Sequence, residues 1–176
     1  MQDVVLEGEN PKLILASRLE PQKAVLRFLS VVNRLVKEGS KFSVHILGDG
    51  IEKDEIKNFI DENNLSETCF LYGNQQNPFC YIRKADLFVL PSIWEAAPMV
   101  YNEAMILGVP VFTTNTISAQ EMIGTKGFIC ENSQDGIYSE LKKVLENTKL
   151  IEQKKTMLKN YCYDNTSTIA KIMSLL

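Results

Sequence analysis

Hydrophobic residues in this chain form two kinds of pattern that alternate from one end to the other. One kind is a short continuous apolar run between polar or glycine-containing segments, which is typical of strands buried on both faces. The runs predict six strands, at residues 13–16, 42–47, 68–72, 87–90, 109–113 and 128–130.

The other kind is a longer stretch in which apolar residues recur with helical spacing. Val25, Leu29 and Val32 follow this period, and Gly39 is placed to end the helix that contains them. Helices are expected at residues 21–38, 51–63, 79–84 and 98–107, and over most of 134–176. Strands alternating with helices predict an α/β fold, a Rossmann-like doubly wound parallel sheet of about six strands with helices on both faces.

Composition narrows the class of protein. A length of 176 residues, 45% of them hydrophobic, suits a single globular domain, in which residues 1–10 are expected to be a linker. The net charge of −3 gives no general attraction for nucleic acid, and no apolar stretch approaches the ~20 residues that span a bilayer. The N-terminus has no signal-peptide pattern, so we expect a cytoplasmic protein.

Metal and redox chemistry have little support in the sequence. The cysteines Cys69, Cys80, Cys130 and Cys162 are irregularly spaced, and His45 is the only histidine. We therefore expect no metal site, and buried free thiols at Cys69 and Cys130. His45 is more consistent with a hydrogen-bonded strand residue than with a catalytic base.

The most informative pair of residues is Glu95 and Glu103. Glu95 is expected in the loop after the strand at 87–90, and Glu103 about two turns into a helix that begins near Pro98. Ligands of parallel sheets bind at the carboxyl ends of the strands, where helix N-termini attract anions. Two carboxylates there can bind the hydroxyl groups of a sugar-bearing ligand, and Trp94 either stacks on that ligand or packs beneath the loop.

Other segments follow strands at the same edge. Arg18 and Lys23 come after the first strand, and two cations near a helix N-terminus indicate either an anion between them or simple solvation. Gly48-Asp49-Gly50 either lets backbone approach a ligand or forms a tight turn in which Asp49 caps the following helix. The segment Tyr72-Gly73-Asn74-Gln75 either contacts a base through its backbone or is a plain turn.

Taken in order, these segments resemble the C-terminal domain of GT-B glycosyltransferases of family 4. The resemblance covers residues 13–147 and rests on Ser17-Arg18-Leu19 with Gln22-Lys23, on Leu47-Gly48-Asp49-Gly50, on residues 85–92, on the Glu95 to Glu103 motif, and on Gly108-Val109-Pro110-Val111. It implies a retaining hexosyltransferase that moves a sugar from a nucleoside-diphosphate sugar to a glycan, lipid or other acceptor in cell-surface polysaccharide or glycoconjugate synthesis. It also implies that no metal or other cofactor is needed.

The resemblance assigns roles to individual residues. Glu95 would contact the donor sugar near the reacting centre, Glu103 would bind the ribose hydroxyls, and Arg18 and Lys23 would bind the diphosphate. Backbone N–H groups of Met99 and Val100 would meet the distal phosphate, and backbone of residues 72–74 would contact the base. The donor-binding positions held by small or backbone groups are Gly48, Tyr72, Gly73, Asn74, Ala96, Ala97, Met99 and Val100.

The chain also departs from the family pattern. Ala96 and Ala24 stand where the family usually has glycine, and each adds a methyl group where backbone approaches the ligand or takes a positive φ. Nothing in the sequence encodes the N-terminal acceptor domain, so we expect the chain alone to be inactive, with any contact to the inner face of the membrane made through that domain. Residues 164–176 would be the helix that crosses back to it. A GT-B nucleotide-sugar epimerase half and a non-catalytic nucleotide-sugar-binding or scaffold domain are the alternatives.

Overall fold

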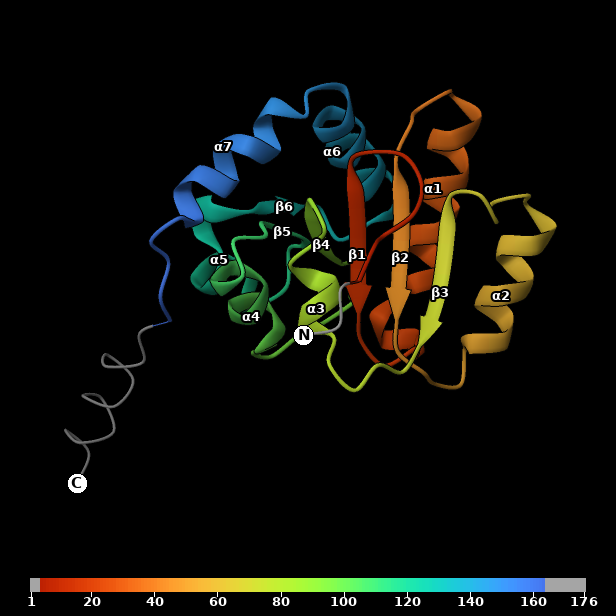
Figure 1. The fold of residues 1–176 in the computed structure, drawn as a ribbon, viewed down its shortest axis with the longest axis horizontal. Coiled ribbons are helices and arrows are strands. Elements are labelled where there is room, and N and C mark those ends of the chain that lie inside the picture. Colours follow the sequence, from red (N-terminus) through yellow and green to blue (C-terminus); the bar gives the residue numbers. More distant parts are fainter. Residues whose placement is uncertain (1–3, 164–176) are drawn as a thin grey trace.

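The computed structural model describes residues 4–163, so the crossover helix predicted at 164–176 lies outside the described part. Its centre is a six-stranded sheet in the order β3-β2-β1-β4-β5-β6 (Figure 1). Every neighbouring pair is parallel, and Leu13 of β1 lies opposite Val44 of β2 and Leu87 of β4. The strands are β1 Lys12–Ala16, β2 Ser43–Leu47, β3 Cys69–Gly73, β4 Leu87–Leu90, β5 Val111–Thr114 and β6 Phe128–Cys130.

Helices cover both faces of this sheet, which confirms the predicted fold class. In Figure 1, α3 and α4 lie in front of the sheet, α1 and α6 lie behind it, and α7 crosses one edge. The helices are α1 Val25–Lys37, α2 Lys53–Glu62, α3 Phe79–Ile82, α4 Val100–Ile106, α5 Ala119–Met122, α6 Gln134–Glu146 and α7 Lys149–Leu158.

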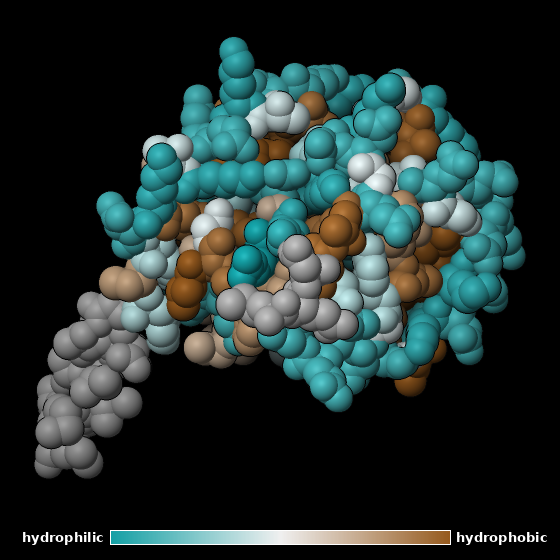
Figure 2. Space-filling view, in the orientation of Figure 1, coloured by the Kyte–Doolittle hydropathy of each residue, from teal (hydrophilic) through white to brown (hydrophobic). Residues whose placement is uncertain are grey.

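The alternation of side chains along each strand divides the core between the two faces. Leu13 and Leu15 pack with the buried side of α1, whereas Ile14 between them packs with α4 on the other face. Both faces are buried, which explains why the strands are continuous apolar runs rather than alternating ones. On the surface in Figure 2, hydrophobic atoms are exposed in separate patches among hydrophilic residues.

The helix predicted at residues 21–38 is interrupted. Pro21–Lys23 forms a 3-10 turn, η1, and α1 begins only at Val25. Ala24 between them has φ 52° and ψ 39°, the left-handed conformation that glycine adopts most easily. The apolar period gave no sign of this break, because it depends on how η1 contacts the rest of the protein.

Two further helical predictions need correction. The helix predicted to begin near Pro98 begins at Val100, so Glu103 lies in its first turn rather than two turns inside. The sequence also gave no signal for the short helix α5 or for the 3-10 turn η2, Gly124–Lys126. Short turns of this kind have too few residues to show a helical period.

The N-terminal segment does not extend away from the domain. Leu6 is buried against the face of the sheet that carries α4, and the Glu9 carbonyl accepts a hydrogen bond of 2.8 Å from Ser43 Oγ. Figure 1 shows this segment running in front of β1 and β2. Residues 4–10, predicted as a linker, therefore cover a part of the sheet.

His45 is fully buried on β2, as expected for a hydrogen-bonded strand residue. Its ring nitrogens lie 3.1 Å from Ser43 Oγ and 3.1 Å from the Tyr72 hydroxyl, and its ring stacks on Phe70. Burial, with a smaller effect from Lys12, lowers the pKa of His45 from 6.5 to about 4.

This pKa predicts a loss of stability in mild acid. Below pH 6.5 His45 becomes protonated in the unfolded chain, whereas in the folded chain it stays neutral down to about pH 4. The free energy of unfolding should therefore fall by about 2 kcal/mol between pH 6.5 and pH 5. Urea unfolding across this range measures it. His45 is the only histidine, so His45→Gln should flatten the curve; an unchanged slope in the variant would contradict the assignment.

Candidate functional site

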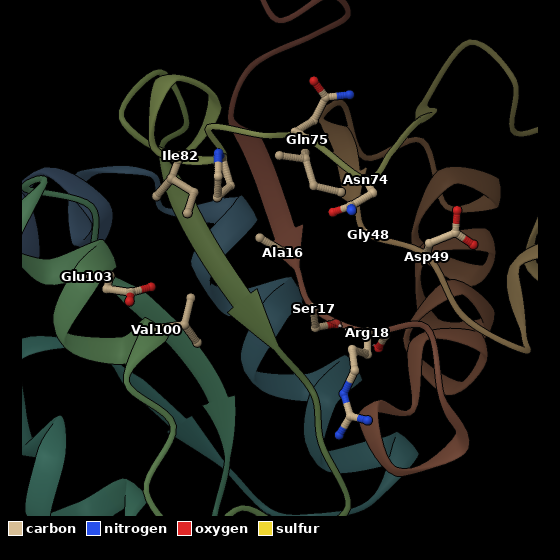
Figure 3. Close-up of a pocket in the computed structure, with 12 residues that line it drawn as sticks. Ala16, Ser17, Arg18, Gly48, Asp49, Asn74, Gln75, Ile82, Val100 and Glu103 are labelled. Atoms are coloured by element: carbon tan, nitrogen blue, oxygen red, sulfur yellow. Dashed lines mark hydrogen bonds between the residues drawn. The ribbon is translucent and has the colours of Figure 1, made fainter.

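A cavity of about 380 Å³ opens at the carboxyl ends of β1 and β2, the edge at which ligands of such sheets bind (Figure 3). It brings together five of the predicted site residues from four separate segments. The cavity is lined by Ala16, Ser17, Arg18, Leu47, Gly48, Asp49, Asn74, Gln75, Pro78, Ile82, Val100 and Glu103.

Glu103 points from α4 toward the opposite wall of this cavity, which carries Gly48 and Asn74 (Figure 3). Its side chain is half-buried, and no hydrogen-bond or ion-pair partner reaches it from residues 4–163. The helix behind it is fixed, because the buried Tyr101 hydroxyl lies 2.7 Å from Thr113 Oγ1 on β5. Burial raises the pKa of Tyr101, so this link persists at neutral pH.

Arg18 lines the same cavity but is turned differently. Its side chain is 72% exposed, and its guanidinium donates to Glu20 over 2.8 Å. In Figure 3 it extends away from Asn74 and Gln75. Arg18 pairs with Glu20 and Lys23 pairs with Glu95, so each cation has an acidic partner of its own, and their binding of a common anion stays a prediction.

Lys23 and Glu95 form the tightest ion pair at this edge. Lys23 Nζ lies 2.6 Å from Glu95 Oε1, and the two side chains are only 15% and 8% exposed. Ser92 Oγ donates to the same Oε1 atom over 2.6 Å. The Oε1 atom of Glu95 therefore accepts hydrogen bonds from both Lys23 and Ser92. Lys23 and Glu95 are 72 residues apart in the sequence.

The glycines after β2 have a structural reason. A Cβ atom at Gly48 would lie 1.8 Å from the Ser17 carbonyl oxygen, and one at Gly50 would lie 2.3 Å from that of Leu19. Only glycine lets the loops after β1 and β2 cross so closely. Asp49 between them is not a helix cap, since it accepts from the Gly50 N–H and pairs with Lys53, and these contacts lower its pKa.

The backbone after β3 is already engaged in part. The Tyr72 carbonyl accepts from Gln75 Nε2 over 2.7 Å, and the Gly73 carbonyl accepts from the Gly48 N–H over 2.8 Å. Asn74 is exposed at the cavity. In the segment predicted to contact a base, the carbonyl groups of Tyr72 and Gly73 are therefore already hydrogen-bonded, whereas Asn74 is exposed to the cavity.

The loop between β4 and α4 is mostly exposed around the buried Glu95. Trp94 is 60% exposed and Met99 is 53% exposed, so Trp94 does not pack beneath the loop. Ala96 and Ala97 are exposed as well. Within the described residues, Ala24 and Asn64 are the non-glycine residues with positive φ, so the methyl group of Ala96 adds no backbone strain of that kind.

The N-terminus of α4 offers two backbone donors. Within residues 4–163, no backbone carbonyl accepts from the N–H groups of Met99 or Val100, as is usual for the first residues of a helix. Val100 lines the cavity beside Glu103.

Sequence reasoning missed several residues of the site. It assigned no role to Ser92, whose hydroxyl binds Glu95, nor to Pro78 and Ile82, which line the cavity. Ser92 shares its place directly after a strand with many uninvolved residues, and Pro78 and Ile82 carried no local signal.

The described residues provide two further findings. No cluster of three or more histidine, cysteine or acidic residues among residues 4–163 is arranged to hold a metal ion. None of the helices within that range is long and apolar enough to cross a membrane.

The sequence of this chain matches a known protein family over most of its length. The family model described as "Glycosyl transferases group 1" matches residues 1–163. The chain belongs to the group 1 glycosyl transferases. A Campylobacter jejuni N-acetylgalactosamine-N,N'-diacetylbacillosaminyl-diphospho-undecaprenol 4-alpha-N-acetylgalactosaminyltransferase is 33% identical over 155 residues, which cover 85% of this chain and 41% of that protein. An Escherichia coli UDP-Gal:alpha-D-GlcNAc-diphosphoundecaprenol alpha-1,3-galactosyltransferase is 30% identical over 132 residues, which cover 72% of this chain and 32% of that protein.

Solved structures agree on the fold. A TarM variant of S. aureus, in complex with Fondaparinux, alpha-GlcNAc-glycerol and UDP, matches with a TM-score of 0.81 at 23% identity, over 94% of this chain and 35% of that one. HepE of Anabaena, in complex with UDP and glucose, matches with a TM-score of 0.75 at 20% identity, over 95% of this chain and 49% of that one. The fold is that of the C-terminal domain of GT-B glycosyltransferases, and this group 1 chain spans less than half of each relative.

Proposed function

We propose that this chain is the donor-binding part of a retaining, metal-independent GT-B hexosyltransferase of family 4. It would take a sugar from a nucleoside-diphosphate sugar, for which UDP serves as the test nucleotide because TarM and HepE are described with UDP. The acceptor would be a lipid-linked glycan or a polymer, in line with the diphospho-undecaprenol acceptors in the names of two relatives. The rest of a longer protein would supply the acceptor site.

The observation that carries this proposal is the cavity between Glu103 and Asn74. The carboxylate is half-buried, has no protein partner among residues 4–163, and faces a wall that carries Asn74 and Gln75 across a cavity of about 380 Å³. A carboxylate accepts hydrogen bonds from two neighbouring hydroxyl groups, so Glu103 would bind the ribose. The base would lie toward Asn74, where backbone of the segment that includes Tyr72 and Gly73 is nearby.

The diphosphate would lie between the ribose and Glu95. Arg18 is mobile enough to leave Glu20, because an exposed ion pair contributes little stability. Lys23 would remain near Glu95 and share its charge with the phosphates, and the N–H groups of Met99 and Val100 would bind the distal phosphate. These groups stabilise the negative charge that develops on the leaving diphosphate.

Glu95 would contact the donor sugar. Its Oε1 atom is taken by Lys23 and Ser92, so Oε2 is the oxygen that is left to accept from a sugar hydroxyl. Ala96 and Ala97 next to it are small and exposed, and leave room for the hexose.

Calorimetric titration with UDP, UDP-glucose and pyrophosphate tests these roles. The wild-type chain should bind UDP weakly and transfer no sugar by itself. Glu95→Ala should leave UDP binding unchanged within about twofold and weaken UDP-glucose about tenfold, as expected for one charge-assisted hydrogen bond. Arg18→Ala should weaken all three ligands. A wild-type chain that binds no nucleotide at millimolar concentration would refute the proposal.

A further inference from the structure

The loop that carries Glu95 is held by an unusual set of contacts. Its backbone from Pro91 to Trp94 is irregular. The carbonyl groups of these four residues therefore take no part in the backbone hydrogen bonds of a helix or a sheet. Four consecutive carbonyl oxygens instead accept hydrogen bonds from side chains of four other elements. The donors are Arg27 Nη2 to Pro91 at 2.7 Å, Thr114 Oγ1 to Ser92 at 2.5 Å, Asn132 Nδ2 to Ile93 at 2.6 Å, and Gln22 Nε2 to Trp94 at 3.1 Å.

Two of these donors also bind each other. Arg27 Nη2 lies 2.9 Å from Asn132 Oδ1, so the side-chain amide of Asn132 has both ends fixed. Its oxygen accepts from Arg27 and its nitrogen donates to the Ile93 carbonyl. Arg27 comes from α1 and Asn132 from the loop before α6, and the bond between their side chains is partly buried.

The hydrogen bonds from Arg27 and Asn132 hold the backbone that leads to Glu95. The Pro91 and Ile93 carbonyls lie on either side of Ser92, whose hydroxyl binds Glu95 Oε1. A shift of this backbone would move both Ser92 and Glu95, while Lys23 approaches from a separate element. The Arg27–Asn132 pair is thus one of the contacts that hold the backbone from which the carboxylate extends.

We propose that Arg27 and Asn132 are positioning residues for Glu95, which hold its carboxylate where it meets the donor sugar. The inference rests on the proposed function, because it assumes that Glu95 contacts that sugar. Small displacements of a group that orients substrate are costly in reactions of this kind. Neither residue lines the cavity, so both would act through Glu95.

The chain offers a closely matched control for Asn132. Asn63, at the end of α2, also accepts from a side chain through Oδ1, that of Asn33, and donates through Nδ2 to the Phe59 carbonyl. It belongs neither to the cavity nor to the loop before α4. Each variant thus removes one bond accepted and one bond donated by an asparagine side chain. Asn132→Ala does so beside the candidate site, and Asn63→Ala does so away from it.

The binding test compares UDP-glucose with UDP. Asn132→Ala should weaken UDP-glucose about fivefold, the size expected for one lost hydrogen bond, and change UDP by less than about twofold. Asn63→Ala should change neither ligand. Asn132→Asp, which keeps the acceptor for Arg27 and loses the donor to Ile93, should behave like Asn132→Ala. In the Glu95→Ala background, Asn132→Ala should have no further effect on UDP-glucose, because the two residues act as one unit.

A second measurement needs no ligand. Trp94 is the only tryptophan of the chain and lies within the loop, so its fluorescence anisotropy reports on the loop directly. Asn132→Ala should lower this anisotropy, whereas Asn63→Ala should not.

The outcomes separate the two proposals. If Glu95→Ala binds UDP-glucose and UDP in the wild-type ratio, the proposed function of Glu95 fails. If Glu95→Ala lowers that ratio but Asn132→Ala leaves it unchanged, or if the two effects add in the double variant, the positioning role alone is refuted. An unchanged Trp94 anisotropy in Asn132→Ala also refutes it.

Discussion

Lys23→Met is expected to lower the free energy of unfolding by about 3 kcal/mol. The reason is that Glu95 is only 8% exposed and would lose the cation that lies 2.6 Å away. A buried carboxylate without a partner is far more costly than a broken ion pair on the surface. Urea unfolding followed by circular dichroism measures the change.

Lys53→Met is the control for this variant. Lys53 pairs with Asp49 over 2.7 Å, but the two side chains are 45% and 53% exposed. Its replacement should cost less than about 1 kcal/mol, as is typical of surface pairs. The double variant Lys23→Met, Glu95→Gln should recover at least half of the stability lost in Lys23→Met. If Lys23→Met and Lys53→Met destabilise equally, the Lys23–Glu95 pair contributes no more than a surface contact.

Glu103→Ala is expected to weaken UDP binding by tenfold or more. Two ribose hydroxyls donating to a half-buried carboxylate make charge-assisted bonds of about 1.5–3 kcal/mol each. Pyrophosphate has no ribose, so its affinity should be unchanged. Calorimetric titration of both ligands measures the difference.

The control for this variant is Glu121→Ala. Glu121 also lies in the first turn of a short helix, α5, but it is exposed and outside the cavity. Its replacement should leave both ligands unaffected. Equal binding of UDP by Glu103→Ala and wild type would show that Glu103 is a helix-surface charge without a role in nucleotide binding.

Local sequence determined the strands and much of the edge at which the site lies. The strands at 87–90 and 128–130 were predicted to the residue, because short apolar runs between polar segments are a direct consequence of burial on both faces. The alternation of strands and helices then placed the residues after β1, β2, β3 and β4 at one edge of the sheet. Glu103, Arg18, Gly48, Asn74 and Val100 do line one cavity there.

What the sequence left open depended on contacts between distant segments. It allowed Gly48 a role in ligand approach or in a turn, and the 1.8 Å separation between a Cβ atom at Gly48 and the Ser17 carbonyl shows that the crossing of two loops requires glycine. It gave no sign that Lys23 pairs with Glu95, 72 residues away, or that Arg18 pairs with Glu20.

The sequence by itself thus determined the fold class and the set of chemical groups at the carboxyl edge, since hydrophobic period and position after a strand are local properties. Only the tertiary structure decided how these groups are paired and held. Asn132 carries no motif, and its role is visible only because the loop before α6 comes within 2.6 Å of the Ile93 carbonyl. Hydrogen bonds between residues far apart in the chain leave no local pattern, because their partners are chosen by packing rather than by spacing.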